Sequence, residues 1–225
     1  ILSFVIAICM LRTSAAIAQE GEPIVIGTSL PLTGTFSIPG SKHQEGYELC
    51  VQQINDNGGL LGRPVEIIIQ DNRSDTEQAI SQYERLINED NVDLIFGTFS
   101  SRLTFPTSAI AEQNGMVYPI PAGGALRIYE QGFENMFYFQ QDAGEFIGNA
   151  PIDALNDLVG QDSEDYPETA IVVHADDFFA NATADGLLGN EVLSPEGDVI
   201  IDLAPGLLAE NGIEVAGEEI YPGEG

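Results

Sequence analysis

Between residues 24 and 124 the chain alternates short apolar runs with longer segments whose apolar residues recur at helical spacing. The runs at 24–30, 65–69 and 94–96 are rich in Ile, Val and Leu. Nearly continuous apolar runs of this kind, in which Glu66 is the one charged residue, are typical of parallel strands that are covered on both faces. The intervening segment has apolar residues at i, i+3, i+4 and i+7, namely Tyr47, Cys50, Val51 and Ile54. The alternation therefore predicts an α/β fold with helices on both faces of a parallel sheet.

The same alternation continues to residue 140. Ile80, Tyr83 and Ile87 form a second helical stripe, and residues 116–118 and 136–139 are short apolar strands. Residues 107–113 have helical character, and because proline lacks a backbone donor, Pro106 favours a helix start one turn after Ser101. We expect an N-terminal lobe over residues 19–140, with the chain crossing into a second lobe after the last strand.

Residues 141–225 are expected to form part of the second lobe. Its first clear strand is 171–173, preceded by a helix in which Pro151 marks a late start or a kink. Residues 194–206 contain two prolines and two glycines around the apolar run 199–203, which indicates an inserted strand or hairpin. A further strand-like segment covers 213–220.

Small and hydroxyl-bearing residues follow two of the predicted strands. Ser100 and Ser101 come after the strand at 94–96, and Ala122-Gly123-Gly124-Ala125 come after the strand at 116–118. In an open α/β sheet, small ligands bind at the carboxyl ends of the strands. A helix beginning at the serines would offer free N–H groups to a carboxylate, although either serine could simply cap that helix. The glycines allow close backbone approach, but an ordinary βα turn would also use them.

The phrases SLPLTG, NGGLLGR, GTFSS, AGGA and GFENMFYF occur in that order along the chain. In their order and spacing the chain resembles the extracytoplasmic solute-binding proteins of ABC importers, in the branched-chain amino-acid (Leu/Ile/Val-type) family. The resemblance covers roughly residues 24–180. It implies a type I periplasmic-binding-protein-like fold, with two Rossmann-like lobes that close on an amino acid, and no catalysis. Because family members continue past residue 225, it also implies that the second lobe is incomplete here.

The resemblance assigns ligand-binding roles to nine residues. Ser101 is the first of them, and the others are Ser100, Ala122, Gly123, Gly124, Ala125, Phe36, Phe179 and Asp142. Ala125 stands where relatives commonly carry serine or threonine, and Phe179 stands where they place a tyrosine. Each change removes a hydroxyl, which favours an apolar amino acid. Asp142, with Glu145 close by, lies nearest the position of an ammonium partner in the family, although a solvated acid is the alternative.

The first residues have the apolar core and small-residue end of a secretory signal over residues 1–18, without its basic start. Cleavage after Ala18 is the expected processing, and a lipid anchor at Cys9 is the alternative. We therefore expect a periplasmic or secreted protein. Cys50 would then be the remaining cysteine, and its place on the apolar face of a helix predicts a buried, inert thiol.

The 36 acidic residues far outnumber the seven basic residues, for a formal charge of −29, or −30 once Arg12 is removed with the signal. Such a charge repels nucleic acid and anionic membranes. It indicates either adaptation to a salty exterior or an exported protein that is merely acidic.

No nucleotide-binding, P-loop or nucleophile-elbow motif occurs in the sequence. His174 precedes Asp176 and Asp177, but no second cluster in the sequence completes a metal site. We therefore expect no enzyme activity, metal or cofactor, and a monomer whose partners are an amino acid or related solute and an ABC permease. The alternatives are a receptor's sensor domain of the same fold, a binding protein for urea or amides, and an enzyme on a related fold.

The acidic composition predicts that salt stabilises the protein. Mutual repulsion among the acids should fall as ionic strength rises, because the Debye length shrinks to about 3 Å at 1 M salt. Thermal melts of the intact mature protein across a KCl series should show a rising Tm. A Tm that stays flat or falls with added KCl would contradict the interpretation as a protein of a saline habitat.

Overall fold

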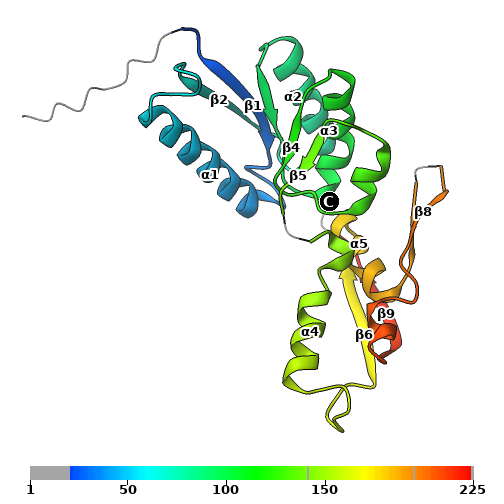
Figure 1. Ribbon diagram of the computed structural model, residues 1–225. Coiled ribbons are helices and arrows are strands. Elements are labelled where there is room, and N and C mark those ends of the chain that lie inside the picture. Colours follow the sequence, from blue (N-terminus) through cyan, green and yellow to red (C-terminus); the bar gives the residue numbers. More distant parts are fainter. Residues whose placement is uncertain (1–20, 141, 195, 224–225) are drawn as a thin grey trace, which may run out of the picture.

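The computed structural model describes residues 21–140, 142–194 and 196–223. The predicted signal peptide lies outside the described residues. Two bodies follow one another along the chain (Figure 1). Lobe one contains every strand and helix up to β5, and lobe two contains the elements after it. The α/β class with parallel sheets is confirmed.

Lobe one is built on parallel strands. Its three-stranded sheet has the order β2-β1-β3, with Ile26 paired to both Ile67 and Leu94. A second parallel pair, β4-β5, continues this surface, because the Gly97 N–H donates to the Pro119 carbonyl at 2.8 Å and Phe99 bridges to Ala122. The strands are β1 (Ile24–Leu30), β2 (Val65–Asp71), β3 (Leu94–Phe96), β4 (Tyr118–Ile120) and β5 (Met136–Tyr138).

Helices cover both faces of this sheet (Figure 1). On one face, Val51 and Ile54 of α1 (Ser37–Asp56) pack against Ile24, Ile26 and Val65. On the other face, α2 (Thr76–Asn88) and α3 (Ser101–Gln113) enclose a larger core with β3 and β4. The buried members of that core are Tyr83, Leu86, Val92, Ile95, Ala111, Tyr118 and Ile120. The 3₁₀ segment η1 (Leu126–Gln131) follows β4.

Three predictions for lobe one are wrong. Cys50 is exposed, because the half-buried stripe of α1 runs through Tyr47, Val51 and Ile54, and Cys50 lies about 60° to one side of Tyr47 at 3.6 residues per turn. Helix α3 begins at Ser101, a turn before the predicted start, with Pro106 inside it. The proline falls early in the helix, and the Thr107 hydroxyl donates to the Leu103 carbonyl at 2.8 Å beside it. Strand β4 also lies two residues later than predicted.

Lobe two is smaller and pairs β6 (Thr169–Ala175) with β9 (Glu214–Tyr221) in parallel. Its helical elements are η2 (Gly144–Phe146), α4 (Asn149–Leu158), α5 (Phe178–Leu188) and α6 (Leu207–Glu210). Pro151 lies in the first turn of α4, so it marks a late helix start. The core consists of Ile152, Val172, Ala184, Leu208 and Ile213. Ile171 and Val173 of β6 remain 62% and 63% exposed, so one face of this sheet is largely uncovered.

The predicted insertion is an antiparallel hairpin of β7 (Glu191–Leu193) and β8 (Val199–Asp202). The chain leaves α5 at Gly189 and comes back to the same point at Gly206. A Cβ built on Gly189 would lie 2.5 Å from the Gly206 nitrogen, and both glycines have positive φ. The hairpin is therefore an insertion between α5 and α6 whose two ends lie next to each other. Strand β7 contacts η1 of lobe one.

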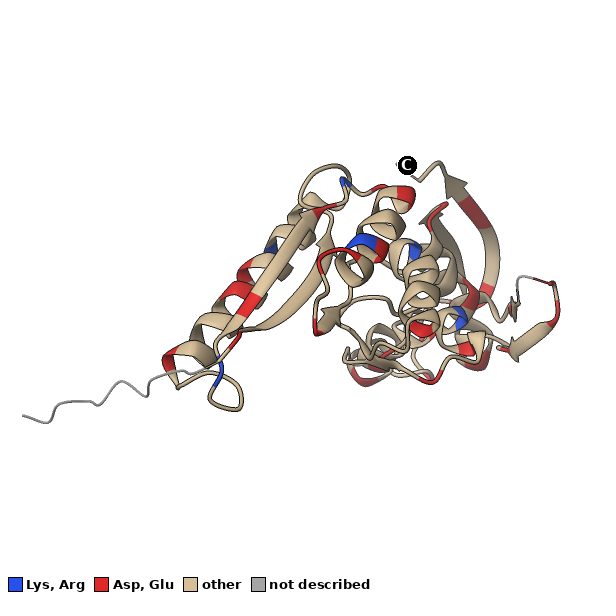
Figure 2. Ribbon diagram, turned by 90° about the horizontal axis from the view of Figure 1, so that it is seen from above, with Lys and Arg blue, Asp and Glu red and all other residues tan. Residues whose placement is uncertain are grey.

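Acidic residues are spread over the elements of both lobes, with few basic residues between them (Figure 2). Within the described residues, the ion pairs of Lys42 and Arg85 lie at the surface, where such pairs contribute little to stability. None of the helices in the described part of the chain is long and apolar enough to cross a membrane.

Because its two ends meet, the hairpin should be removable. Deletion of residues 190–205, which joins Gly189 to Gly206, should preserve cooperative unfolding. It should lower the free energy of unfolding by only about 1–3 kcal/mol, the contribution of the buried Val192 side chain. Urea titration followed by circular dichroism measures this, with Val192→Ala as the matched variant. A deletion protein without a cooperative transition would show that the hairpin is integral to lobe two.

Candidate functional site

A cavity of about 320 Å³ lies where the strand ends of lobe one meet the start of α5 in lobe two. Seven of the nine predicted ligand-binding residues line it, and Ala125 and Asp142 do not. The lining residues that the sequence analysis missed are Phe99, Gln140, Ile147 and Asp177. The cavity is therefore lined by residues that are far apart in sequence, from Phe36 to Phe179, and it lies at the carboxyl ends of the lobe-one strands.

Helix α3 points its N-terminus into this cavity, and Ser100 is its cap. The Ser100 Oγ accepts from the Leu103 N–H at 3.4 Å. Ser100 has φ 81° and ψ 145°, a region that is otherwise almost confined to glycine and costs about 1–3 kcal/mol. The first N–H groups of a helix have no partner within it, and they carry the positive end of the helix dipole. This wall of the cavity therefore suits a carboxylate.

Ser101 has a different role from Ser100. It is only 1% exposed, and its Oγ accepts from the Ala125 backbone N–H at 3.2 Å. That bond joins the loop after β4 to the start of α3. The Ser101 hydroxyl keeps its own proton, which it can donate to a ligand while the loop remains bound.

The glycine loop after β4 has no room for side chains. A Cβ at Gly123 would lie 2.8 Å from the Thr104 side chain, and one at Gly124 would lie 2.5 Å from the Tyr138 hydroxyl and 3.0 Å from the Phe179 ring. The Tyr129 hydroxyl also donates to the Gly123 carbonyl at 2.5 Å. Burial raises the pKa of the Tyr129 phenol far above its usual range, so this hydroxyl stays protonated and remains a donor. The loop is thus fixed with its backbone against the cavity.

Aromatic rings form the apolar wall. Phe36 meets Phe99 edge to face at a centroid distance of 5.7 Å, and Phe99 lies 5.5 Å from the His43 ring. The Arg102 guanidinium lies 5.1 Å from the centre of the Phe36 ring and donates to the Ser74 carbonyl at 2.8 Å. These contacts hold Phe36 in place at the edge of the cavity.

Lobe two contributes Ile147, Asp177 and Phe179 to the cavity. Asp177 caps α5, and its Oδ1 accepts from the Phe179 N–H at 3.0 Å. An Asp that follows a strand and precedes a helix is a capping signal, and that signal could have placed Asp177 at the strand's carboxyl edge. Phe99 directly precedes Ser100, so its position near the site could also have been predicted from the sequence. Nothing in the sequence indicated Gln140 or Ile147.

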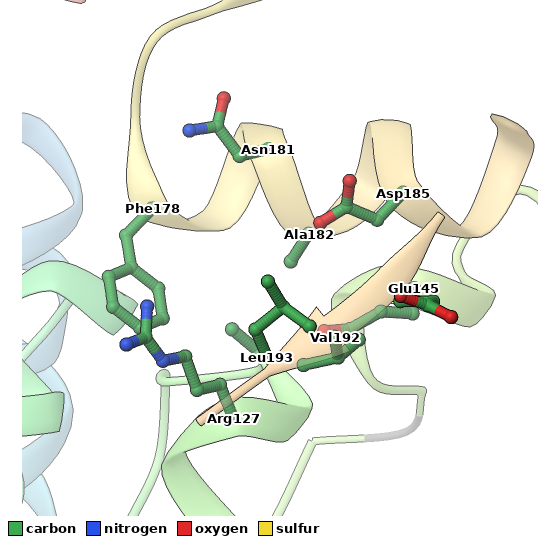
Figure 3. Close-up of a pocket in the computed structure, with 10 residues that line it drawn as sticks. Arg127, Glu145, Phe178, Asn181, Ala182, Asp185, Val192 and Leu193 are labelled. Carbon is green, nitrogen blue, oxygen red and sulfur yellow. The ribbon is translucent and has the colours of Figure 1, made fainter. Parts of the chain in front are cut away.

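Ala125 and the two acids after β5 lie elsewhere. Asp142 is exposed, and its backbone carbonyl accepts from the Tyr138 hydroxyl at 3.3 Å. Ala125 and Glu145 line a second cavity of about 260 Å³, together with Arg127 and β7 (Figure 3). Glu145 is 3% exposed, accepts from the Leu126 N–H at 3.0 Å, and has its pKa raised by burial.

The histidine that suggested a metal site is bound by protein groups. His174 Nε2 lies 2.9 Å from the Glu218 carboxylate, and Nδ1 lies 3.1 Å from the Ala175 carbonyl. Burial alone would lower the pKa of His174, but these two acceptors stabilise the protonated ring and raise it above the usual value. Among the described residues no group of three or more metal-binding side chains comes together.

The bond between Ser101 and Ala125 predicts a measurable contribution to stability. Ser101→Ala would leave the buried Ala125 N–H without its acceptor, so the free energy of unfolding should fall by about 1–3 kcal/mol. Urea unfolding of both proteins measures the difference. Ser81→Ala, at an exposed position of α2, is the control and should change stability by less than about 0.5 kcal/mol. Equal stability of the wild type and Ser101→Ala would contradict the role given to this bond.

Comparison with known proteins agrees with this architecture. Residues 23–162 match the family model described as "Periplasmic binding protein". The chain is 28% identical over 182 residues to the Leu/Ile/Val-binding protein homolog 7 of Brucella suis, an alignment that covers 80% of this chain and 45% of that protein. The chain thus spans about half the length of the curated relatives it matches.

Two solved structures show the same fold. The branched-chain amino-acid transporter substrate-binding protein LivJ of Streptococcus pneumoniae, in complex with isoleucine, superposes with a TM-score of 0.70 at 20% identity and covers 91% of this chain and 51% of its own. A solute-binding protein of an R. palustris ABC transporter, in complex with benzoate, gives 0.69 at 22% identity and covers 89% and 49%. Since the family model matches more than half of the residues, the chain belongs to the periplasmic binding protein family, as its sequence motifs indicated.

Proposed function

We propose that this protein is the extracytoplasmic substrate-binding component of an ABC importer and that it binds an apolar amino acid between its lobes. The observation that carries the proposal is the 320 Å³ cavity, which joins the N-terminus of α3 to four large apolar side chains. These are Phe36, Phe99, Ile147 and Phe179. A ligand with one anionic end and one apolar end fits such a lining.

The two walls of the cavity would bind different parts of the ligand. The ligand carboxylate would lie against the N-terminus of α3, where Ser100, Ser101 and the backbone of Gly123 supply donors. The ligand's side chain would contact the aromatic wall, and burying a leucine-sized group contributes about 1.5–3 kcal/mol. Ile147 and Phe179 come from lobe two, so a bound ligand favours the closed arrangement of the lobes.

The closed protein would then dock on a membrane permease, which is the step that distinguishes a transport component from a sensor of the same fold. Similar structures that are named for a branched-chain amino-acid transporter or an ABC transporter support transport. Export to the periplasm or exterior, and a monomeric state, follow from the same proposal. The isoleucine and benzoate complexes of similar structures support small carboxylates as the ligand class.

A thermal-shift screen tests the proposal on the intact protein. We expect leucine, isoleucine or valine to raise the Tm, with a stabilisation of about 2.7 kcal/mol at a hundredfold excess over Kd. Benzoate, urea, small amides and sugars form the other arms of the screen. A shift with urea or sugars alone would overturn the amino-acid assignment, and chemical turnover of any stabilising ligand would favour the enzyme alternative.

A further inference from the structure

The second cavity, of about 260 Å³, lies between the lobes on another face of α5 and shares no lining residue with the 320 Å³ cavity. Its lining includes Arg127 of η1 in lobe one, and Asp185 of α5 and Val192 of β7 in lobe two. Pockets for drug-sized ligands usually measure about 300–1,000 Å³, so this cavity suits a smaller molecule.

Arg127 lines this cavity without an acidic partner. None of the ion pairs in the described residues involves it, and its Nε is buried without a hydrogen-bond partner. The guanidinium carbon lies 5.3 Å from the centre of the Phe105 ring and 6.0 Å from that of the Phe178 ring. These rings hold the guanidinium in place but accept no hydrogen bond from Nε. Because a buried donor without an acceptor is unfavourable, this part of the cavity favours a carboxylate.

Two acids line the same cavity without a cationic partner. Glu145 is 3% exposed, and burial raises its pKa, with a further rise from the nearby negative charge of Asp185. Across the described part of the chain, the ion pairs include neither acid. Asp185 Oδ1 accepts from Asn190 Nδ2 at 2.9 Å, which is a neutral donor. Asn181 also lines the cavity, and its Oδ1 is buried without a partner. These acceptors favour a cationic group with several N–H donors.

Apolar side chains separate the charges of opposite sign. Arg127 lies at one side of the cavity and Glu145 and Asp185 lie at the other, with Val192 and Leu193 of β7 between them (Figure 3). An α-amino acid carries its carboxylate and ammonium on the same carbon atom, so it does not match two separated charges. A molecule with a short methylene chain between the two groups matches both ends and the apolar middle.

We propose that the second cavity is a binding site for a small ω-amino acid, a zwitterion whose carboxylate and ammonium lie at the two ends of a methylene chain. Arg127 binds the carboxylate, and Asp185 together with Glu145 binds the ammonium. Because both lobes line the cavity, the bound molecule stabilises the arrangement of the lobes that forms it. The site can be occupied whether or not a ligand is bound in the 320 Å³ cavity.

Isothermal calorimetry on the intact protein tests the site with 4-aminobutanoate, 5-aminopentanoate and 6-aminohexanoate. Pentanoate and pentylamine are the comparison compounds, since each lacks one charge of 5-aminopentanoate. The wild type should bind at least one of the ω-amino acids about tenfold or more tightly than either comparison compound, the scale of one charged hydrogen bond. If none of the three binds more tightly than pentanoate and pentylamine, the inference is overturned and the cavity holds water alone.

Two variants locate the binding site. Arg127→Met removes the guanidinium and keeps an apolar chain beside the rings, and it should weaken binding of the best ω-amino acid by about tenfold or more. Asp185→Asn keeps an acceptor for Asn190 and should have an effect of the same size. Arg85→Met, at an exposed position of α2, removes the same charge as the first variant and should leave affinity within about twofold. Wild-type affinity in Arg127→Met, or in Asp185→Asn should the first not fold, would overturn the inference.

A competition experiment separates this site from the proposed function. Saturating L-leucine should leave the affinity for the ω-amino acid unchanged or raise it, whereas competitive loss would place that molecule in the 320 Å³ cavity and overturn the second site. A thermal shift with leucine and none with any ω-amino acid would leave the proposed function intact and overturn this inference. The reverse pattern, with the effects of the two variants, would support the second site and remove the proposed function.

Discussion

The hydrogen bond from the Ala125 N–H to Ser101 Oγ is the contact on which the site depends. It joins two loops at the carboxyl edge of the sheet that are 24 residues apart in sequence. The Ser100 backbone, held at positive φ, places Ser101 at the head of α3, and the Tyr129 hydroxyl fixes the glycine loop from its other side. Strain of this kind persists only where the surroundings determine it, and here several buried contacts do so.

The strand-and-helix order of lobe one could be predicted because each element has a strong local pattern. Strand β2 was visible as the run beginning at Val65, and the stop of α1 was visible at Asn57-Gly58. The position of Cys50 could not be predicted from the helical pattern, because a residue at i+3 can lie at the border of a buried stripe. Pro106 suggested a later helix start, since local propensity does not register the tertiary contacts that hold the first turn of α3.

Part of the candidate site could also be predicted from the sequence, because local patterns show where the strands end. Residues that follow strands, such as Ser101 and Gly123, can be placed at the sheet edge from topology alone. Asp177 had no predicted ligand-binding role, because only the way in which lobe two faces lobe one brings it to the cavity. The roles of Ala125 and Asp142 were assigned by position along the chain, and a shift of a few residues decides whether a side chain meets the cavity or the surface behind it. The ligand-binding roles of all these residues remain predictions.

Because the two ends of the hairpin, Gly189 and Gly206, lie next to each other, a reporter domain could be inserted between them. The two attachment points touch, so a guest with adjacent termini could replace the hairpin without separating α5 from α6. The hairpin belongs to lobe two and extends toward η1 of lobe one (Figure 1). A fluorescent guest placed there would therefore report the relative motion of the lobes from a position outside the ligand cavity.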